Sequence, residues 1–180
     1  MPDRTPDLDA WLPDATVRTC HVRAAVAAPD ALWRAAGEIR LADTRTLARL
    51  VRWRIPGTPE TATYDELFRG YPFTVLDEGE RHLVSGLCGR IWTLQRDYPW
   101  LSGPAEFAAW DQPGTVRVLF AHWVSTAADG RAELCSEARV QPVDRQSALR
   151  LRALWAMIGR FERLVGAEPL RLAVRRAEAG

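Results

Sequence analysis

Two side chains in this sequence, His122 and Glu162, combine acid–base chemistry with a place on an otherwise apolar face. His122 alternates with Phe120 and Val124, so a strand over residues 115–125 would point the imidazole inward with them. Glu162 follows Leu151 by eleven residues, which places it within roughly 20° of Leu151 on a helix. In a cavity, burial would shift the pKa of either group and make it a candidate acid, base or hydrogen-bond partner for a ligand.

The same two residues also have a purely structural interpretation. His122 can be a core histidine with satisfied hydrogen bonds, and Glu162 can reach water or an arginine where the helix tilts or frays. His21 and His82 are weaker candidates, since each shares a strand face with an arginine. The three histidines fall on separate strands with no carboxylate at metal-ligand spacing, so we predict no bound metal and no cofactor.

The usual catalytic motifs are absent from the sequence. There is no Gly-x-Ser-x-Gly elbow, no Gly-rich phosphate loop and no cysteine or serine beside a usable histidine. All 24 basic residues are arginine, which excludes Schiff-base chemistry and a lysine general base. The balance of 24 basic and 23 acidic residues argues against nucleic-acid binding. These absences favour a non-enzymatic role.

Length and composition indicate one domain. With 180 residues and 47% hydrophobic content the chain can bury a core, so we expect a leader over residues 1–13 and a single domain over 14–180. The acidic, proline-broken start and the lack of a long apolar run predict a soluble, cytoplasmic protein without an integral membrane segment. Cys20, Cys88 and Cys135 are predicted to be buried free thiols. A monomer and a homodimer both remain open.

The first half of the chain should hold one strand and short helices. Residues 16–27 alternate like a strand, and Pro29 then begins a short helix that ends before Gly37. Residues 41–55 are ambiguous, and we interpret them as a helical turn followed by a strand over 50–55. Residues 63–69 should form another short helix with a threonine cap.

The second half of the sequence predicts two β-hairpins. Residues 73–77 pair with 81–92 through a turn containing glycine, and residues 115–125 pair with 132–140 through a two-residue Asp-Gly turn. Two glycines inside the 81–92 strand indicate close backbone packing or a bulge. The long connection over 98–114 has room for one helical turn. With these, about six strands are expected, all antiparallel.

A long amphipathic helix is predicted near the end of the chain, over roughly residues 144–165, with Asp144 as its N-cap. A helix of this length spans on the order of 30 Å, enough to cross a sheet. Pro169 is expected to break or kink it before a last segment over 170–177. The stripe predicted to face the sheet comprises Ser147, Leu151, Leu154, Trp155, Ile158, Phe161 and Val165.

Several short motifs occur in a fixed order along nearly the whole chain. They are Leu12-Pro13, residues 22–36, residues 86–92, Phe107 with residues 111–114, Asp129-Gly130, residues 136–140, and Leu154-Trp155 with Ile158. In this order the sequence resembles the START and Bet v 1-like superfamily, also called SRPBCC or polyketide cyclase-like, and within it a bacterial branch.

The resemblance implies an α+β helix-grip fold. Its features would be a strongly curved antiparallel sheet of about six or seven strands around a long C-terminal helix, two short helices after the first strand, and a hydrophobic cavity. It also implies binding or carriage of a hydrophobic small molecule such as a lipid, a polyketide or a quinone-like compound. The superfamily shares no catalytic set, so no catalytic residue is carried over.

Two other functions stay open at this stage. One is a cofactor-independent polyketide cyclase, aromatase or dehydratase that uses the same cavity, with His122 or Glu162 as acid or base. The other is an interaction module whose core is filled by its own side chains. Trp155 is placed against the cavity because aromatic side chains form apolar walls. The predicted cavity residues are Phe73, Leu87, Ile91, Trp110, Val118, Phe120, His122, Ser136, Trp155, Ile158 and Glu162.

Overall fold

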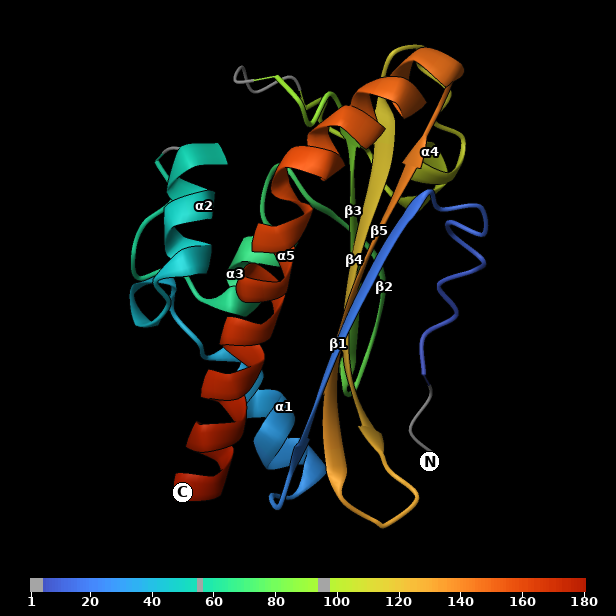
Figure 1. The fold of residues 1–180 in the computed structure, drawn as a ribbon. Helices are drawn as coiled ribbons and strands as arrows, with labels where there is room; N and C mark the ends of the chain where they lie inside the picture. Colours follow the sequence, from blue (N-terminus) through green and yellow to red (C-terminus); the bar gives the residue numbers. More distant parts are fainter. Residues whose placement is uncertain (1–4, 55–56, 94–97) are drawn as a thin grey trace.

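The computed structural model describes residues 5–54, 57–93 and 98–180, and the side chains of residues 53–54 and 158–165 lie outside this description. The described chain has an α+β fold with a five-stranded antiparallel sheet in the order β1-β5-β4-β3-β2 and a long C-terminal helix (Figure 1). The strands are β1 Val17–Ala25, β2 Thr74–Gly79, β3 His82–Gly89, β4 Val116–Thr126 and β5 Ala132–Pro142.

Short helices fill the connections, and one long helix ends the chain. Three α-helices and one 3-10 turn lie between β1 and β2, rather than the two short helices that were predicted. The helices are α1 Pro29–Gly37, η1 Leu41–Asp43, α2 Thr46–Arg54, α3 Tyr64–Arg69, α4 Pro104–Ala108 and α5 Arg145–Ala179.

The expected sheet of six or seven strands is wrong for the described residues, because residues 50–54 end the helix α2 instead of forming a strand. Leu47, Ala48 and Val51 are buried together, and this spacing of one and four residues matches a helix face. The alternation that predicted a strand was therefore the weaker of two overlapping patterns. Residue 55, the last of the predicted strand, lies outside the described residues.

The β4–β5 hairpin is confirmed, but its two-residue turn is not. Thr126 pairs with Ala132, so five residues form the connection. The amide of Gly130 donates to the carbonyl of Ala127, and Gly130 adopts a φ of 82°. The connection is a tight turn that ends in a residue with a left-handed backbone conformation. Glycine adopts this conformation without strain because it has no Cβ.

The two faces of the sheet pack against different parts of the chain. Figure 1 shows α1, α2, α3 and α5 on one side, and the N-terminal segment and α4 on the other. Leu83 and Leu87 of β3 belong to clusters on the helix side, whereas Val84 and Cys88 pack on the back. Gly86 also faces the back, where an added Cβ would lie 2.6 Å from the ring of Phe107. This explains the glycine inside the strand by close packing.

Arg139 ties the N-terminal segment to the back of the sheet. Its guanidinium donates to Asp9 Oδ1 at 2.5 Å, to Glu137 Oε1 at 2.6 Å and to the Leu12 carbonyl at 3.1 Å. Arg139 is 7% exposed, and Leu8 and Leu12 are buried beside it. Residues 5–12, expected to form a leader, thus cover one face of the sheet.

The helix α5 begins at its predicted cap but is longer than predicted. Asp144 accepts from the amide of Ser147 at 2.7 Å, while Ser147 Oγ accepts from the amide of Asp144. The expected break at Pro169 does not occur, since α5 continues to Ala179. The missing amide of a proline costs a helical hydrogen bond. Tertiary contacts offset that cost, because Leu170 and Ala173 are buried against α1 and the sheet.

Glu168, next to that proline, caps the N-terminus of a different helix. Its carboxylate accepts from the amides of Arg45, Thr46 and Leu47 at 2.8, 2.9 and 3.2 Å. These amides open α2 and have no helical acceptor of their own. The cap fixes α2 against the middle of α5.

The prediction of three buried free thiols is confirmed for two. Cys88 and Cys135 are buried and free, whereas Cys20 is free but exposed. Cys20 lies on the edge strand β1, and its side of that strand is covered less than the centre of the sheet.

Arg139→Met is expected to lower the free energy of unfolding by about 3 kcal/mol, because it leaves the carboxylate of Glu137 without its buried partner. Urea unfolding measures this change, and hydrogen exchange at the amide of Leu12 should accelerate with it. Arg131→Met, in the exposed β4–β5 turn, is the control and should stay within about 0.5 kcal/mol. Equal effects of the two substitutions would contradict the anchoring role.

Glu168→Ala is expected to lower the free energy of unfolding by about 1 kcal/mol, the usual cost of losing an N-cap. The effect should be local as well, with faster hydrogen exchange at the amides of Thr46 and Leu47. Unchanged exchange at both amides would show that Glu168 does not hold α2.

Candidate functional site

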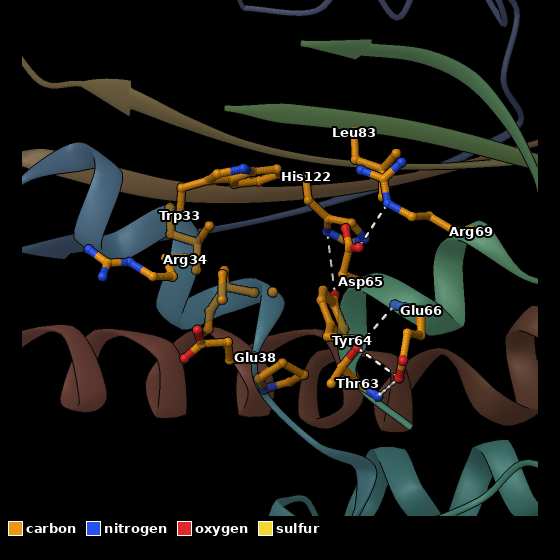
Figure 2. Close-up of a pocket in the computed structure, with 15 residues that line it drawn as sticks. Trp33, Arg34, Glu38, Thr63, Tyr64, Asp65, Glu66, Arg69, Leu83 and His122 are labelled. Atoms are coloured by element: carbon orange, nitrogen blue, oxygen red, sulfur yellow. Dashed lines mark hydrogen bonds and ion pairs between the residues drawn. The ribbon is translucent and has the colours of Figure 1, made fainter. Parts of the chain in front are cut away.

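A cavity of about 500 Å³ lies between the helix side of the sheet and the helices α1, α3 and α5 (Figure 2). Its walls combine apolar and polar side chains from five elements. Trp33 comes from α1, Tyr64 from α3, His122 from β4, Leu134 from β5 and Leu170 from α5. The site therefore exists only when segments far apart in the sequence fold together.

Local hydrogen bonds place Tyr64 at the start of α3. Thr63 and Glu66 form a capping box, in which Thr63 Oγ1 accepts from the amide of Glu66 and the Glu66 carboxylate accepts from the amide of Thr63. The amide of Tyr64 donates to the Ile39 carbonyl at 2.7 Å. These contacts join α3 to the chain leaving α1 and direct the Tyr64 ring into the cavity (Figure 2).

His122 is the buried polar group of the pocket, at 5% exposed. Its Nδ1 lies 3.4 Å from the hydroxyl of Tyr64, and its ring centroid lies 4.6 Å from that of Phe68. Burial lowers the pKa of His122 to about 3, so the imidazole is uncharged at neutral pH. Its Nε2 has no hydrogen-bond partner among the described residues.

The hydroxyl of Tyr64 links His122 to the neighbouring strand. Ser136 of β5 is directly opposite His122 of β4 and hydrogen-bonds the Tyr64 hydroxyl. Burial raises the pKa of Tyr64, which therefore keeps its proton. The three side chains form a short buried chain of uncharged hydrogen-bonding groups.

Aromatic rings form the wall beside this chain. The ring of Phe68 lies 5.3 Å from that of Phe120 and 5.0 Å from that of Phe73. Phe73 and Phe120 are themselves 5.6 Å apart and nearly perpendicular. Tilted and edge-to-face contacts of this kind favour a rigidly packed aromatic wall.

Two other buried side-chain oxygens on the same face of the sheet lack partners within the described structure. They are Thr19 Oγ1 of β1 and Ser85 Oγ of β3, which lie in one cross-strand row with Ala138 and Phe120. Buried polar atoms without partners are rare in folded proteins, and each calls for a physical reason. Together with His122 Nε2 they make this face unusually polar for a core.

The predicted cavity residues separate into distinct groups. His122 lines the pocket, and Ser136 lies beside it. Trp110 is on the back of the sheet, where its Nε1 donates to Thr115 Oγ1 at 2.9 Å. The side chains of Ile158 and Glu162 lie outside the described residues. The remaining residues cluster between the sheet and the first turns of α5, namely Phe73, Leu87, Ile91, Val118, Phe120 and Trp155.

Sequence reasoning missed the helical wall of the pocket. Trp33 and Tyr64 were seen only as parts of short helices, and Leu170 was assigned to a segment beyond a break. The capping pattern around Thr63 located the start of α3, but no sequence signal says which strand α3 packs against.

No helix among the described residues is long and apolar enough to cross a membrane. In the same part of the chain, His, Cys, Asp and Glu side chains form no group of three that could hold a metal ion.

Comparison with known proteins gives no family. No family model and no curated protein matches the sequence. A solved hypothetical protein from Helicobacter pylori is 10% identical, with a TM-score of 0.38, covering 99% of this chain and 95% of that one. The structure of Ara h 8.0201 is also 10% identical, with a TM-score of 0.28 and coverage of 91% and 99%. Likenesses this distant carry no conclusion about family or function.

The pKa of His122 predicts a pH dependence of stability. An unfolded histidine titrates near pH 6.5 and folded His122 near 3, so the unfolded state binds the extra proton between these values. Stability therefore falls as pH drops below 6.5, by up to about 1.4 kcal/mol per unit from this group. Urea unfolding at pH 7 and pH 5 should show a loss about 2 kcal/mol larger in the wild type than in His122→Phe. Equal losses would mean that the pKa of His122 in the folded protein is close to its unfolded value near 6.5.

Proposed function

We propose that this chain binds a largely apolar small molecule in the cavity between the sheet and the helices α1, α3 and α5. The observation that carries the proposal is the pairing of that space with a buried, uncharged His122 whose Nε2 lacks a partner among the described residues. Ligand sites are mostly apolar cavities of 300–1,000 Å³ with a few polar groups that orient the ligand, and about 500 Å³ lies within that range.

The arrangement of elements supports the same proposal. A five-stranded antiparallel sheet, helices after the first strand and a long C-terminal helix follow the order that the resemblance to the START and Bet v 1-like superfamily implies. We include membership of this helix-grip group in the proposal. The cavity lies on the side of the sheet that carries α5, where the resemblance implies it.

Charges at the edge of the cavity favour an uncharged ligand. The guanidinium of Arg69 is engaged by Asp65 at 2.8 Å and by Glu78 at 2.6 Å. Glu38 and Glu66 also line the opening and are exposed. A phosphate or carboxylate ligand would meet these acidic groups while Arg69 is already paired, so charge complementarity is poor.

The pKa values favour binding over acid–base catalysis. An efficient general base has a pKa near the working pH, whereas that of His122 is about 3. The pKa of Tyr64 is raised by burial, so Tyr64 releases its proton less readily than a free tyrosine. Neither His122 nor Tyr64 is therefore matched to the acid–base role of the cyclase or dehydratase alternative, and the size of the cavity speaks against a filled core.

The affinity expected of such a site is modest. A ligand with about 20 non-hydrogen atoms gains roughly 0.3 kcal/mol per atom, or about 6 kcal/mol, which corresponds to a Kd of tens of micromolar. Lipids or polyketide-like compounds of this size would fill much of the space.

Ala36→Leu is expected to weaken binding of the apolar dye Nile red at least tenfold, because the added carbons enter the cavity from α1. Ala35→Leu is the matched control, since Ala35 is equally buried in the same helix but does not line the cavity. Dye fluorescence measures binding, and urea unfolding checks that both variants are folded. Native mass spectrometry of the wild type should also reveal a co-purifying apolar compound. Unchanged dye binding in Ala36→Leu would place the ligand elsewhere.

A further inference from the structure

The outer face of the first half of α5 carries exposed apolar side chains. Leu149 is 58% exposed and Met157 is 71% exposed, although both side chains are large and apolar. Ala153 and Ala156 lie between them along the helix and are exposed as well. Figure 1 shows no other helix over these turns of α5. Single exposed apolar side chains are common on protein surfaces, whereas a connected stripe of them marks an interaction surface.

The four side chains form one stripe along the helix. At about 100° per residue they fall within an arc of roughly 100°, and the middle of this arc lies opposite the buried Leu151. Leu151 packs on the sheet together with Val116 and Val118. The first half of α5 is therefore apolar on two opposite sides, and the sheet covers only one of them.

Arginines border the stripe on both sides. Arg145 and Arg152 lie along one side of it and Arg150 along the other, and all three are exposed. Arg145 and Arg152 have no ion pair among the described residues. The guanidinium of Arg150 lies 5.8 Å from the ring of Trp92 and keeps its charge there. No acidic residue occurs over residues 145–161, so this half of the helix is positive although the whole chain has a net charge of only +1.

The neighbouring helix α2 has the same character. Residues 44–59 contain no acidic residue, and Arg45 and Arg49 are exposed without an ion pair in the described part of the chain. Leu50, next to Arg49, is 38% exposed. Because α2 packs against α5, its positive charges add to the field of the arginines on α5 (Figure 1).

We propose that the outer face of α5 docks this protein onto the surface of an anionic lipid bilayer. In the docked state α5 lies in the plane of the headgroups. Leu149 and Met157 reach the acyl chains, and the bordering arginines contact the lipid phosphates. A helix with an apolar stripe and arginine on either side of it has the pattern of an interfacial helix. The proposal does not depend on a ligand in the cavity.

Two other occupants fit this face less well. A nucleic acid would engage the arginines through its phosphates, but it would leave the stripe without an apolar partner. A second copy of the same face would cover the stripe, but it would bring arginines of like charge together. An anionic bilayer supplies negative charge and an apolar interior at the depths where α5 presents arginine and aliphatic side chains.

Vesicle flotation measures the docking directly. The full chain is mixed at about 0.1 M salt with vesicles of phosphatidylcholine alone or with vesicles that contain about 30% phosphatidylglycerol. The affinity for the anionic vesicles should be at least about tenfold higher, and it should fall as salt is raised, because salt screens the arginines. No binding to the anionic vesicles, or equal binding to the two kinds, overturns the proposal. Binding to a short DNA duplex without binding to vesicles overturns it as well.

The double variant Arg145→Gln with Arg152→Gln should bind the anionic vesicles at least about tenfold more weakly, since each arginine near such a surface contributes roughly fivefold. Arg171→Gln with Arg175→Gln is the matched control, because it removes the same charge from exposed positions in the second half of the same helix. The control should change binding by less than about twofold. Equal losses in the two double variants would mean that only net charge matters, and they would overturn the assignment to this face.

The double variant Leu149→Ser with Met157→Ser tests the apolar stripe. It should also weaken binding about tenfold or more, because two side chains no longer enter the acyl region. Val26→Ser is the control, since Val26 is 84% exposed but lies in the connection between β1 and α1. All the substituted side chains are exposed, so the midpoint of urea unfolding should not change. Unaltered vesicle binding in the folded double variant would show that the stripe does not enter the bilayer, and it would overturn the proposal.

Discussion

The pairing register of β4 with β5 is the constraint on which the rest of the molecule depends. It sets His122 opposite Ser136 and Trp123 opposite Cys135. Because side chains alternate along a strand, a slip of one residue would turn the imidazole to the back of the sheet and bring Trp123 under the helices. The left-handed glycine in the turn, Gly130, holds this register at one end. The chemistry of the pocket thus depends on the turn that closes the β4–β5 hairpin.

The sheet forms a central layer, and its two faces are packed differently. On the back, Leu12, Val84 and Phe107 are fully buried in one apolar cluster, and Arg139 holds the covering segment in place. On the helix side, α5 lies chiefly against β1 and β5. The inner surface of β4 and β3 is left to side chains of α1 and α3, which cover it only in part. The cavity lies where α5 leaves part of the five-stranded sheet to the short helices α1 and α3.

The sequence predicted those parts of the fold that depend on local patterns. The hairpins, the Asp144 cap and the inward direction of His122 follow from alternation and capping, which need no knowledge of the tertiary structure. Two of the failures, the strand over 50–55 and the break at Pro169, share one cause. A helical reading of residues 46–54 is supported by the cap that Glu168 supplies from more than a hundred residues away, and Pro169 is tolerated because of what Leu170 packs against. Such long-range contacts override local propensity, and composition gives no sign of them.

The buried polar atoms without described partners reflect a competition between packing and function. A core built only for stability would place apolar side chains at the positions of Thr19, Ser85 and His122, since an unpaired buried polar atom weakens the fold. Here they interrupt the helix side of the sheet. The back carries an apolar cluster that includes Leu119, Ala121 and Trp123, together with two other buried atoms that lack partners among the described residues, His82 Nε2 and Gln141 Oε1. Packing on the back and the tertiary caps around α5 supply stability that the helix side gives up.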